Sequence, residues 1–217
     1  MQIITAQSGA LYVNTYFVVD EHTKKGFIVD PGGYVPAIAK KINDENIDIQ
    51  YIVLTHGHGD HIGGVTELKR RCGGKILKEF PNIKVVAHKK EREMLEDANF
   101  NMSSLFSAPC SVNADIFAED GDELSVGELL LKFIHTPGHS PGGMCIYIEK
   151  ENVLFSGDTL FCQSIGRTDF PGCSLQELLD SIKNKLFILP DETKVLTGHT
   201  GSTEIGFEKR NNPFVHM

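Results

Sequence analysis

Long apolar stretches are what this sequence most clearly lacks. No run approaches the roughly 18 apolar residues of a membrane-spanning helix, and residues 1–6 lack the basic and apolar segments of a secretory signal peptide. No low-complexity linker divides the 217 residues, of which 41% are hydrophobic, so we expect one domain over residues 1–217 with a sizeable core. We therefore expect a cytoplasmic protein with no membrane partner.

A disulfide framework and a basic surface are also missing. The five cysteines form no C-x-x-C pair and leave one unpaired, which favours reduced thiols. The net charge of −8 repels extended phosphate backbones, so we expect no nucleic-acid partner. The short basic runs at 69–71 and 89–92 are interpreted as solvated helix faces.

One histidine-rich segment, T-H-G-H-G-D-H at residues 55–61, stands out instead. On a helix, His56 and His58 would point about 200° apart, whereas in an extended segment they share a face. The apolar run 50–55 before them indicates a buried strand. Gly57 and Gly59 are expected to let the chain bend so that Asp60 and His61 turn toward the same point. A helix over 65–71, ended by Gly73-Gly74, should follow.

Three further metal-ligand residues follow apolar runs in the same way. His139 comes after the run 129–134, Asp158 after 153–157 and His199 after 195–198, each with a small residue before it. Several strands would then deliver side chains to one rim of a sheet. Because an ion held by imidazoles and carboxylates needs more ligands than the histidine-rich segment can aim at one point, these residues are predicted to complete a metal site.

The rest of the chain alternates between strand and helix patterns. Strands are predicted at 14–19, 26–30 and 83–87, helices at 35–43 and 90–97, and a polar stretch at 99–113. Ser174 and Glu177 form a capping box, and a core-facing helix is predicted from the apolar residues Leu175, Leu178, Leu179, Ile182 and Leu186.

Four strings in the sequence together resemble the metallo-β-lactamase superfamily, and within it the glyoxalase II-like hydrolases. They are T-H-x-H-x-D-H, T-P-G-H-S, S-G-D-T-L-F and a late T-G-H, and the match covers nearly the whole chain. Residues 161–171 and 206–214 also resemble small single-domain members of that branch. The resemblance implies an α/β (α+β) fold, a four-layer αββα sandwich with two mixed β-sheets flanked by helices and metals at one edge.

The resemblance also implies a binuclear centre. One divalent ion would bind His56, His58 and His139, a second would bind Asp60, His61 and His199, and Asp158 would bridge them. Zinc is the expected metal, with iron or manganese as alternatives. Two divalent ions and two carboxylates leave a charge of about +2, which favours deprotonation of a bridging water near pH 7. That hydroxide is the expected nucleophile on an acyl carbon, and Asp60 is a candidate for orienting it.

The substrate is expected to be a small anionic thioester. In the glutathione-using enzymes that this chain resembles, a basic side chain nine residues after the bridging aspartate contacts the thiol peptide, and Arg167 occupies that offset. Their two tyrosines are replaced here by Asp169 and Gly201, and only 18 residues follow His199, where they carry a helical domain. Arg167 could equally bind a carboxylate of another substrate or pair with Asp169.

Two activities remain open from sequence. The first is a binuclear hydrolase that cleaves a thioester such as a 2-hydroxyacyl-thiol. The second is a persulfide dioxygenase, which shares the G-R-T-D-F stretch and would hold one ferrous ion on His56, His139 and Asp158. A metal-binding module without turnover is disfavoured by the full ligand set, and lactamase activity by Asp158, where the secreted antibiotic-degrading branch usually has cysteine. His135 is interpreted as structural or as supporting a ligand, and Cys162 as a spectator thiol.

Overall fold

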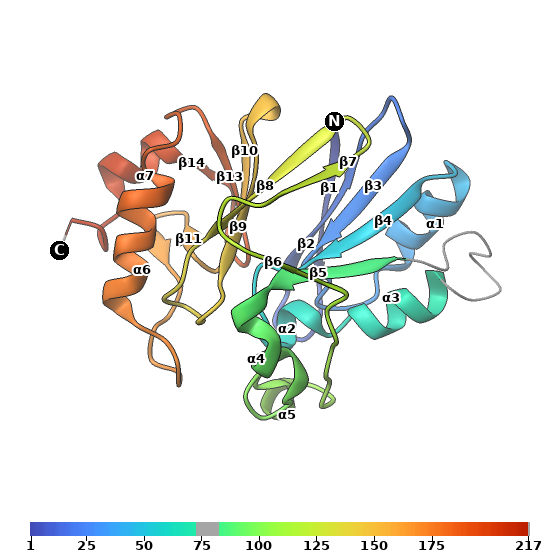
Figure 1. Cartoon of the computed structure of the whole chain (residues 1–217), viewed down its shortest axis with the longest axis horizontal. Coiled ribbons are helices and arrows are strands. Elements are labelled where there is room, and N and C mark those ends of the chain that lie inside the picture. The colour runs from blue at the N-terminus through green and yellow to red at the C-terminus, as the bar shows by residue number, and fades with distance from the viewer. Residues whose placement is uncertain (73–82, 217) are drawn as a thin grey trace.

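The computed structural model describes residues 1–72 and 83–216, so the predicted helix end at Gly73-Gly74 lies outside the described residues. Two six-stranded sheets pack face to face (Figure 1). The first has the order β1 (Gln2–Ser8), β2 (Val13–Val19), β3 (Lys25–Val29), β4 (Asp48–Val53), β5 (Lys84–His88) and β6 (Ile116–Ala118). The second has the order β14 (Thr203–Glu204), β13 (Lys194–Thr197), β10 (Val153–Gly157), β9 (Met144–Ile148), β8 (Leu129–His135) and β7 (Glu123–Val126).

Helices cover the outer faces of both sheets. In Figure 1, α1 (Pro36–Asp44) and α3 (Val65–Cys72) lie beside the first sheet, and α6 (Leu175–Ser181) and α7 (Ile205–Asn211) lie beside the second. Short helices gather near one edge: α2 (Gly59–Ile62), η1 (Lys89–Glu91), α4 (Arg92–Glu96) and α5 (Ser103–Phe106). The other short elements are η2 (Glu149–Glu151), the hairpin β11 (Leu160–Phe161) and β12 (Ser164–Ile165), and η3 (Ile182–Leu186).

Successive side chains of the central strands point to opposite faces of each sheet, and the buried residues form three core layers. On β2, Val18 packs between the two sheets with Phe27 and Phe155, whereas Phe17 faces the helices of the first sheet together with Ile42. A third cluster joins the second sheet to α6 through residues such as Leu154 and Leu178. Both sheets contain parallel and antiparallel pairs. The predicted sandwich of two mixed sheets flanked by helices is therefore confirmed.

Most local predictions hold, with three corrections. The antiparallel pair β2–β3, helix α1 and the Ser174 cap, whose hydroxyl accepts from the Glu177 N–H, are as predicted. Leu175 is 46% exposed and was wrongly predicted to face the core, whereas Leu178, Ile182 and Leu186 of the same segment are fully buried. The predicted helix at 90–97 is divided into η1 and α4, and the polar stretch 99–113 contains α5.

Several strands end at the same edge of the sandwich. Strand β3 runs parallel to β4, and β10 runs parallel to β13. Strand β8 has the same direction as β10, because each pairs antiparallel with β9. The segments that follow these strands therefore meet where the two sheets adjoin.

No helix in the described part of the chain is long and apolar enough to cross a membrane.

Candidate metal centre

The seven predicted ligands converge at this edge and fall into two groups of three around Asp158. The first trio consists of His56, His58 and His139, and its ring nitrogens lie close together. His139 Nε2 is 3.0 Å from His58 Nδ1 and 3.3 Å from His56 Nε2. All three side chains are buried. The first trio therefore joins the loop after β4 to the loop after β8.

The second trio consists of Asp60, His61 and His199. Asp60 and His61 come from α2, and His199 follows β13. His199 Nε2 lies 3.3 Å from His61 Nε2 and 3.1 Å from Asp60 Oδ2. Two nitrogen ligands of one tetrahedral zinc ion, each bonded at ~2.0–2.1 Å, are separated by about 3.3 Å, so both trios have a spacing that fits a shared cation.

Asp158 lies between the two trios. Its Oδ2 is 3.6 Å from both His139 Nε2 and His199 Nε2, and its Oδ1 is 3.4 Å from His61 Nε2. Oδ1 is buried without a hydrogen-bond partner among the described residues. A buried carboxylate oxygen that faces ring nitrogens and lacks a donor is an arrangement that a bound cation satisfies. The residues therefore fit a binuclear metal site.

Hydrogen bonds on the far side of three imidazoles determine which nitrogen faces the centre. His61 Nδ1 donates to Asp30 at 2.9 Å, and His139 Nδ1 donates to the Arg167 carbonyl at 2.8 Å. His56 Nδ1 lies 3.1 Å from the Thr55 hydroxyl, which itself donates to Asp30 and so accepts from the ring. In its neutral form, each ring then carries its proton on Nδ1 and directs the lone pair of Nε2 toward its neighbours. This is the tautomer that metal ligation requires.

Asp30 is a component of the site that sequence reasoning missed. It directly follows β3, and its carboxylate accepts hydrogen bonds from the Thr55 N–H at 2.7 Å, the Thr55 hydroxyl at 2.6 Å and His61. The signal was present, because an acidic residue follows a buried strand here just as Asp158 does. The sequence pattern places Asp30 only as the last residue of the strand predicted at 26–30.

Glu91 corrects the interpretation of residues 89–92 as a solvated face. Lys89, Lys90 and Arg92 are exposed, but the Glu91 side chain is fully buried. Its two oxygens accept the Gly57 and Gly142 N–H groups, each at 2.6 Å. Nothing in the sequence of this mixed basic run indicates that the Glu91 side chain is buried.

Gly57 and Gly59 are required for a reason other than the one predicted. Neither has a positive φ, so the bend does not depend on their conformational freedom. A Cβ on Gly57 would lie 2.9 Å from Glu91 Oε2, and a Cβ on Gly59 would lie 2.5 Å from the Ser103 Cβ. The glycines allow close packing, and α2 produces the turn toward Asp60 and His61.

The charges of the two trios differ. Burial, together with the neighbouring histidines, lowers the pKa of His56 well below its ordinary value, so this ring stays neutral. Burial alone would lower the pKa of His61. The negative charges of Asp158, Asp60 and Asp30 outweigh this effect, and the pKa is raised well above the ordinary value. Burial would raise the pKa of Asp158, yet His61, His139 and His199 hold it below its usual range. The second trio and Asp158 thus favour positive charge.

Arg167, the predicted substrate-binding residue, adjoins the first trio through its backbone carbonyl, which accepts from His139, while its side chain pairs with Asp169. Its guanidinium makes two hydrogen bonds to Asp169, at 2.7 and 2.8 Å, and lies 3.9 Å from the centre of the Phe170 ring. Phe170 in turn contacts the edge of His58. The side chain of Arg167 is 56% exposed, so the pairing with Asp169 leaves part of the cation accessible.

The remaining candidates lie outside the cluster. His135 stacks on His88 with ring centroids 4.0 Å apart and approaches the Pro141 carbonyl through Nε2, which agrees with a structural role. Cys162 is half-buried, and its N–H donates to the Thr200 hydroxyl.

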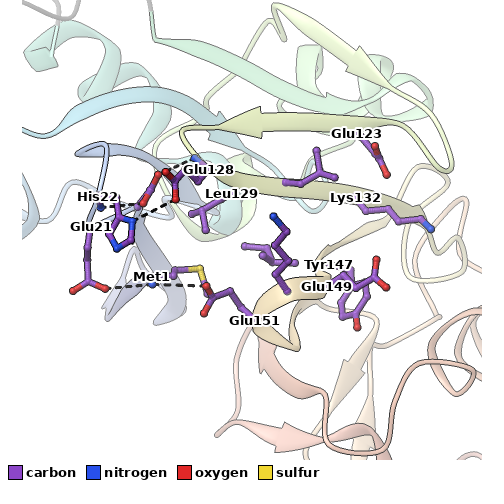
Figure 2. Close-up of a pocket in the computed structure, with 14 residues that line it drawn as sticks. Met1, Glu21, His22, Glu123, Glu128, Leu129, Lys132, Tyr147, Glu149 and Glu151 are labelled. Carbon is purple, nitrogen blue, oxygen red and sulfur yellow. Dashed lines mark hydrogen bonds and ion pairs between the residues drawn. The ribbon is translucent and has the colours of Figure 1, made fainter.

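A separate cavity of about 560 Å³ lies at the N-terminus of the chain and is lined by several acidic residues (Figure 2). There the Met1 amino group pairs with Glu21 and Glu151. None of the seven predicted ligands lines this cavity, so it is distinct from the candidate metal centre.

Comparison with known proteins finds relatives along most of the chain. The model of the family described as the metallo-beta-lactamase superfamily matches residues 8–199. A probable metallo-hydrolase, YqgX of Bacillus subtilis, is 35% identical over 96% of this chain and 94% of its own length. Hydroxyacylglutathione hydrolase GloC of Haemophilus influenzae is 33% identical over 89% of this chain and 88% of its own length.

Solved structures agree along the whole chain. BLEG-1 B3 metallo-beta-lactamase has a TM-score of 0.88 at 39% identity and covers 100% of both chains. TTHA1623 in a di-iron-bound form has a TM-score of 0.81 at 30% identity and covers 99% of this chain and 100% of its own. ETHE1 from Myxococcus xanthus has a TM-score of 0.75 at 25% identity and covers 100% of this chain and 89% of its own.

Proposed function

Because the chain belongs to the metallo-beta-lactamase superfamily, we propose that it is a metal-dependent hydrolase with a binuclear centre that cleaves a small anionic thioester. One observation carries the proposal: two compact trios of ligand atoms share the Asp158 carboxylate. His56, His58 and His139 would hold one divalent ion, and Asp60, His61 and His199 the other. The bound ions would supply Lewis acidity and a water of lowered pKa.

The protein's own groups would orient this chemistry. Asp158 would connect the two halves of the site, since its Oδ2 lies near His139 of the first trio and His199 of the second, and its Oδ1 lies near His61. Asp60 Oδ2 faces His199 and His61, which would place this carboxylate beside the attacking water. Thr55 and Asp30 would keep His56 and His61 in the ligating tautomer. No serine or cysteine nucleophile is needed for such a reaction.

The choice of a thioester is supported by the similarity to hydroxyacylglutathione hydrolase GloC. The exposed guanidinium of Arg167, beside the first trio through Phe170, would attract an anionic carrier or acyl group. Zinc is our proposed metal, because three histidines suit it and a mixed histidine-carboxylate trio also does. The di-iron form of TTHA1623 keeps iron as the main alternative.

A persulfide dioxygenase is the second candidate, favoured by the likeness to ETHE1. One ferrous ion would then bind His56, His139 and Asp158, which form a two-histidine, one-carboxylate set. His139 Nε2 lies 3.3 Å from His56 Nε2 and 3.6 Å from Asp158 Oδ2, so these three side chains are already adjacent.

Metal content and activity together distinguish the proposals. The protein is purified with and without oxygen, zinc, iron and manganese per chain are determined, and three assays follow: thioester hydrolysis, oxygen uptake with a persulfide, and β-lactam hydrolysis. About two metals with thioester hydrolysis supports the first proposal. A single iron with oxygen consumption would replace it with the second, and efficient β-lactam cleavage without thioesterase activity would contradict both.

Asp158→Ala provides the matched loss-of-function test. Since both trios face this carboxylate, the variant should lose turnover and bind fewer metal ions than the wild type. The exposed Asp180→Ala serves as the control and should leave metal content and activity unchanged. Full activity in Asp158→Ala would refute the binuclear site.

A further inference from the structure

Glu91 is a buried carboxylate that the proposed chemistry does not use. It lies at the end of η1, and its side chain has no exposure to solvent. Burial raises the pKa of this group. Burying a carboxylate costs free energy unless its oxygens find donors. The position of those donors indicates what the residue is for.

The two donors belong to the two loops that carry the first trio. Glu91 Oε2 accepts the N–H of Gly57, which lies between His56 and His58. Glu91 Oε1 accepts the N–H of Gly142, three residues after His139. The first loop follows β4 of one sheet, and the second loop connects β8 and β9 of the other. A single carboxylate therefore ties together ligand loops from opposite halves of the sandwich.

The fit around this carboxylate leaves little freedom. A Cβ on Gly57 would lie 2.9 Å from Oε2, and a Cβ on Gly142 would lie 2.9 Å from Oε1 and 2.8 Å from the Glu91 nitrogen. Both loops thus pack directly on the side chain. A carboxylate can accept two N–H groups side by side, whereas an amide offers one acceptor and one donor.

We propose that Glu91 is a positioning residue for the first trio, which sets the spacing of His58 and His139 by holding both ligand loops on one carboxylate. This inference rests on the metal centre of the proposed function. His58 Nδ1 and His139 Nε2, 3.0 Å apart, are the atoms whose separation depends on the two loops.

The second trio is supported by other contacts. His61 is held by Asp30, and Asp60 and His61 share α2. His199 follows β13, and the preceding Gly198 N–H donates to the Gly157 carbonyl. Loss of the Glu91 contacts should therefore weaken one metal site and spare the other.

Glu91→Gln keeps the size of the side chain but places an amide N–H₂ against one of the two backbone N–H groups. Glu93→Gln makes the same chemical change at an exposed position of α4 and is the matched control. Zinc titration of the metal-free proteins, followed by equilibrium dialysis, gives two dissociation constants for each. Histidine side-chain NMR signals assign each constant to a trio.

We expect Glu91→Gln to weaken zinc binding at the first trio by roughly 10- to 100-fold, the usual effect of losing a group that orients metal ligands. The second constant and both constants of Glu93→Gln should match the wild type. Two unchanged constants in Glu91→Gln, or an equal loss at both trios, would overturn the positioning role. A wild type that binds fewer than two ions would instead refute the proposed metal centre.

Gly142→Ala covers the case in which Glu91→Gln does not fold, as judged by circular dichroism. It retains the carboxylate but introduces a methyl group against it. The same selective loss at the first trio is expected. Wild-type constants in a folded Gly142→Ala protein would count against Glu91 as the residue that sets the spacing.

Discussion

Replacement of Asp30 by asparagine tests how strongly one carboxylate controls the metal centre. The Thr55 N–H, which cannot reverse its polarity, requires the amide oxygen at the position of Oδ1. The amide N–H₂ then occupies the position of Oδ2 and faces His61 Nδ1. His61 must accept there and carry its proton on Nε2, the atom that faces Asp60, Asp158 and His199. A protonated Nε2 cannot ligate a metal.

The expected size of the effect follows from the contact that is lost. A hydrogen bond to a charged group contributes about 1.5–3 kcal/mol, and a factor of ten in affinity corresponds to about 1.4 kcal/mol. Asp30→Asn should therefore weaken zinc binding at the second trio by roughly 10- to 100-fold. A smaller loss is expected at the first trio, because Thr55 connects the same carboxylate to His56.

Zinc titration measures the two constants, and long-range ¹H–¹⁵N NMR of the imidazoles reports the tautomer of His61. Asp44→Asn, an exposed substitution on α1, is the control and should behave as the wild type. If Asp30→Asn retained wild-type affinity at both trios with the proton of His61 on Nδ1, the tautomer argument would be refuted.

Three further outcomes follow from single contacts. Arg167→Ala should raise KM for an anionic substrate with little change in kcat. Unchanged steady-state kinetics would leave Arg167 with structural roles alone, its side chain pairing with Asp169 and its carbonyl accepting from His139 Nδ1. Gly198→Ala should weaken zinc affinity at least tenfold, because the new Cβ would lie 2.0 Å from Asp158 Oδ1. Metal analysis after dialysis should then find less zinc than in the wild type. Burial alone would raise the pKa of Asp20, but hydrogen bonds from Thr23, Glu128 and His22 lower it to about 2. Since that pKa is below the ordinary value, the ionised carboxylate should add about 2 kcal/mol to the free energy of unfolding above pH 4, and this contribution is lost as the pH falls toward 2. Urea unfolding should therefore show a larger deficit for Asp20→Asn at pH 6 than at pH 3, and equal deficits would contradict it.

The sequence pointed to the seven side chains that converge in the structure because each carries its signal locally. His56, His58, Asp60 and His61 lie within six residues, and Asp158 and His199 each follow an apolar run and a glycine. Strand ends at one sheet edge then made their convergence expected. The layered fold was predicted from the resemblance to the metallo-β-lactamase superfamily, whereas the apolar run at 50–55 by itself indicated only one buried strand.

The residues that were missed depend on contacts far apart in the chain. Glu91 is 34 residues from Gly57 and 51 from Gly142. Asp30 is 31 residues from His61. Neither partnership has a fixed sequence spacing, and a charged side chain in a polar segment is exposed far more often than buried. Tertiary packing decides such cases, and the same packing explains why Gly57 and Gly59 have no side chain.

The hydrolase and the dioxygenase proposals differ in what they require of the second trio. An iron on His56, His139 and Asp158 needs nothing from Asp60, His61 or His199. Yet these three side chains are as compact as the first trio, with His199 Nε2 3.1 Å from Asp60 and 3.3 Å from His61. Asp158, Asp60 and Asp30 raise the pKa of the buried His61 despite the opposing effect of burial, which means that this half of the site favours an added positive charge. A second cation satisfies that demand while leaving His61 Nε2 unprotonated, so the electrostatics of the second trio support two metals over one.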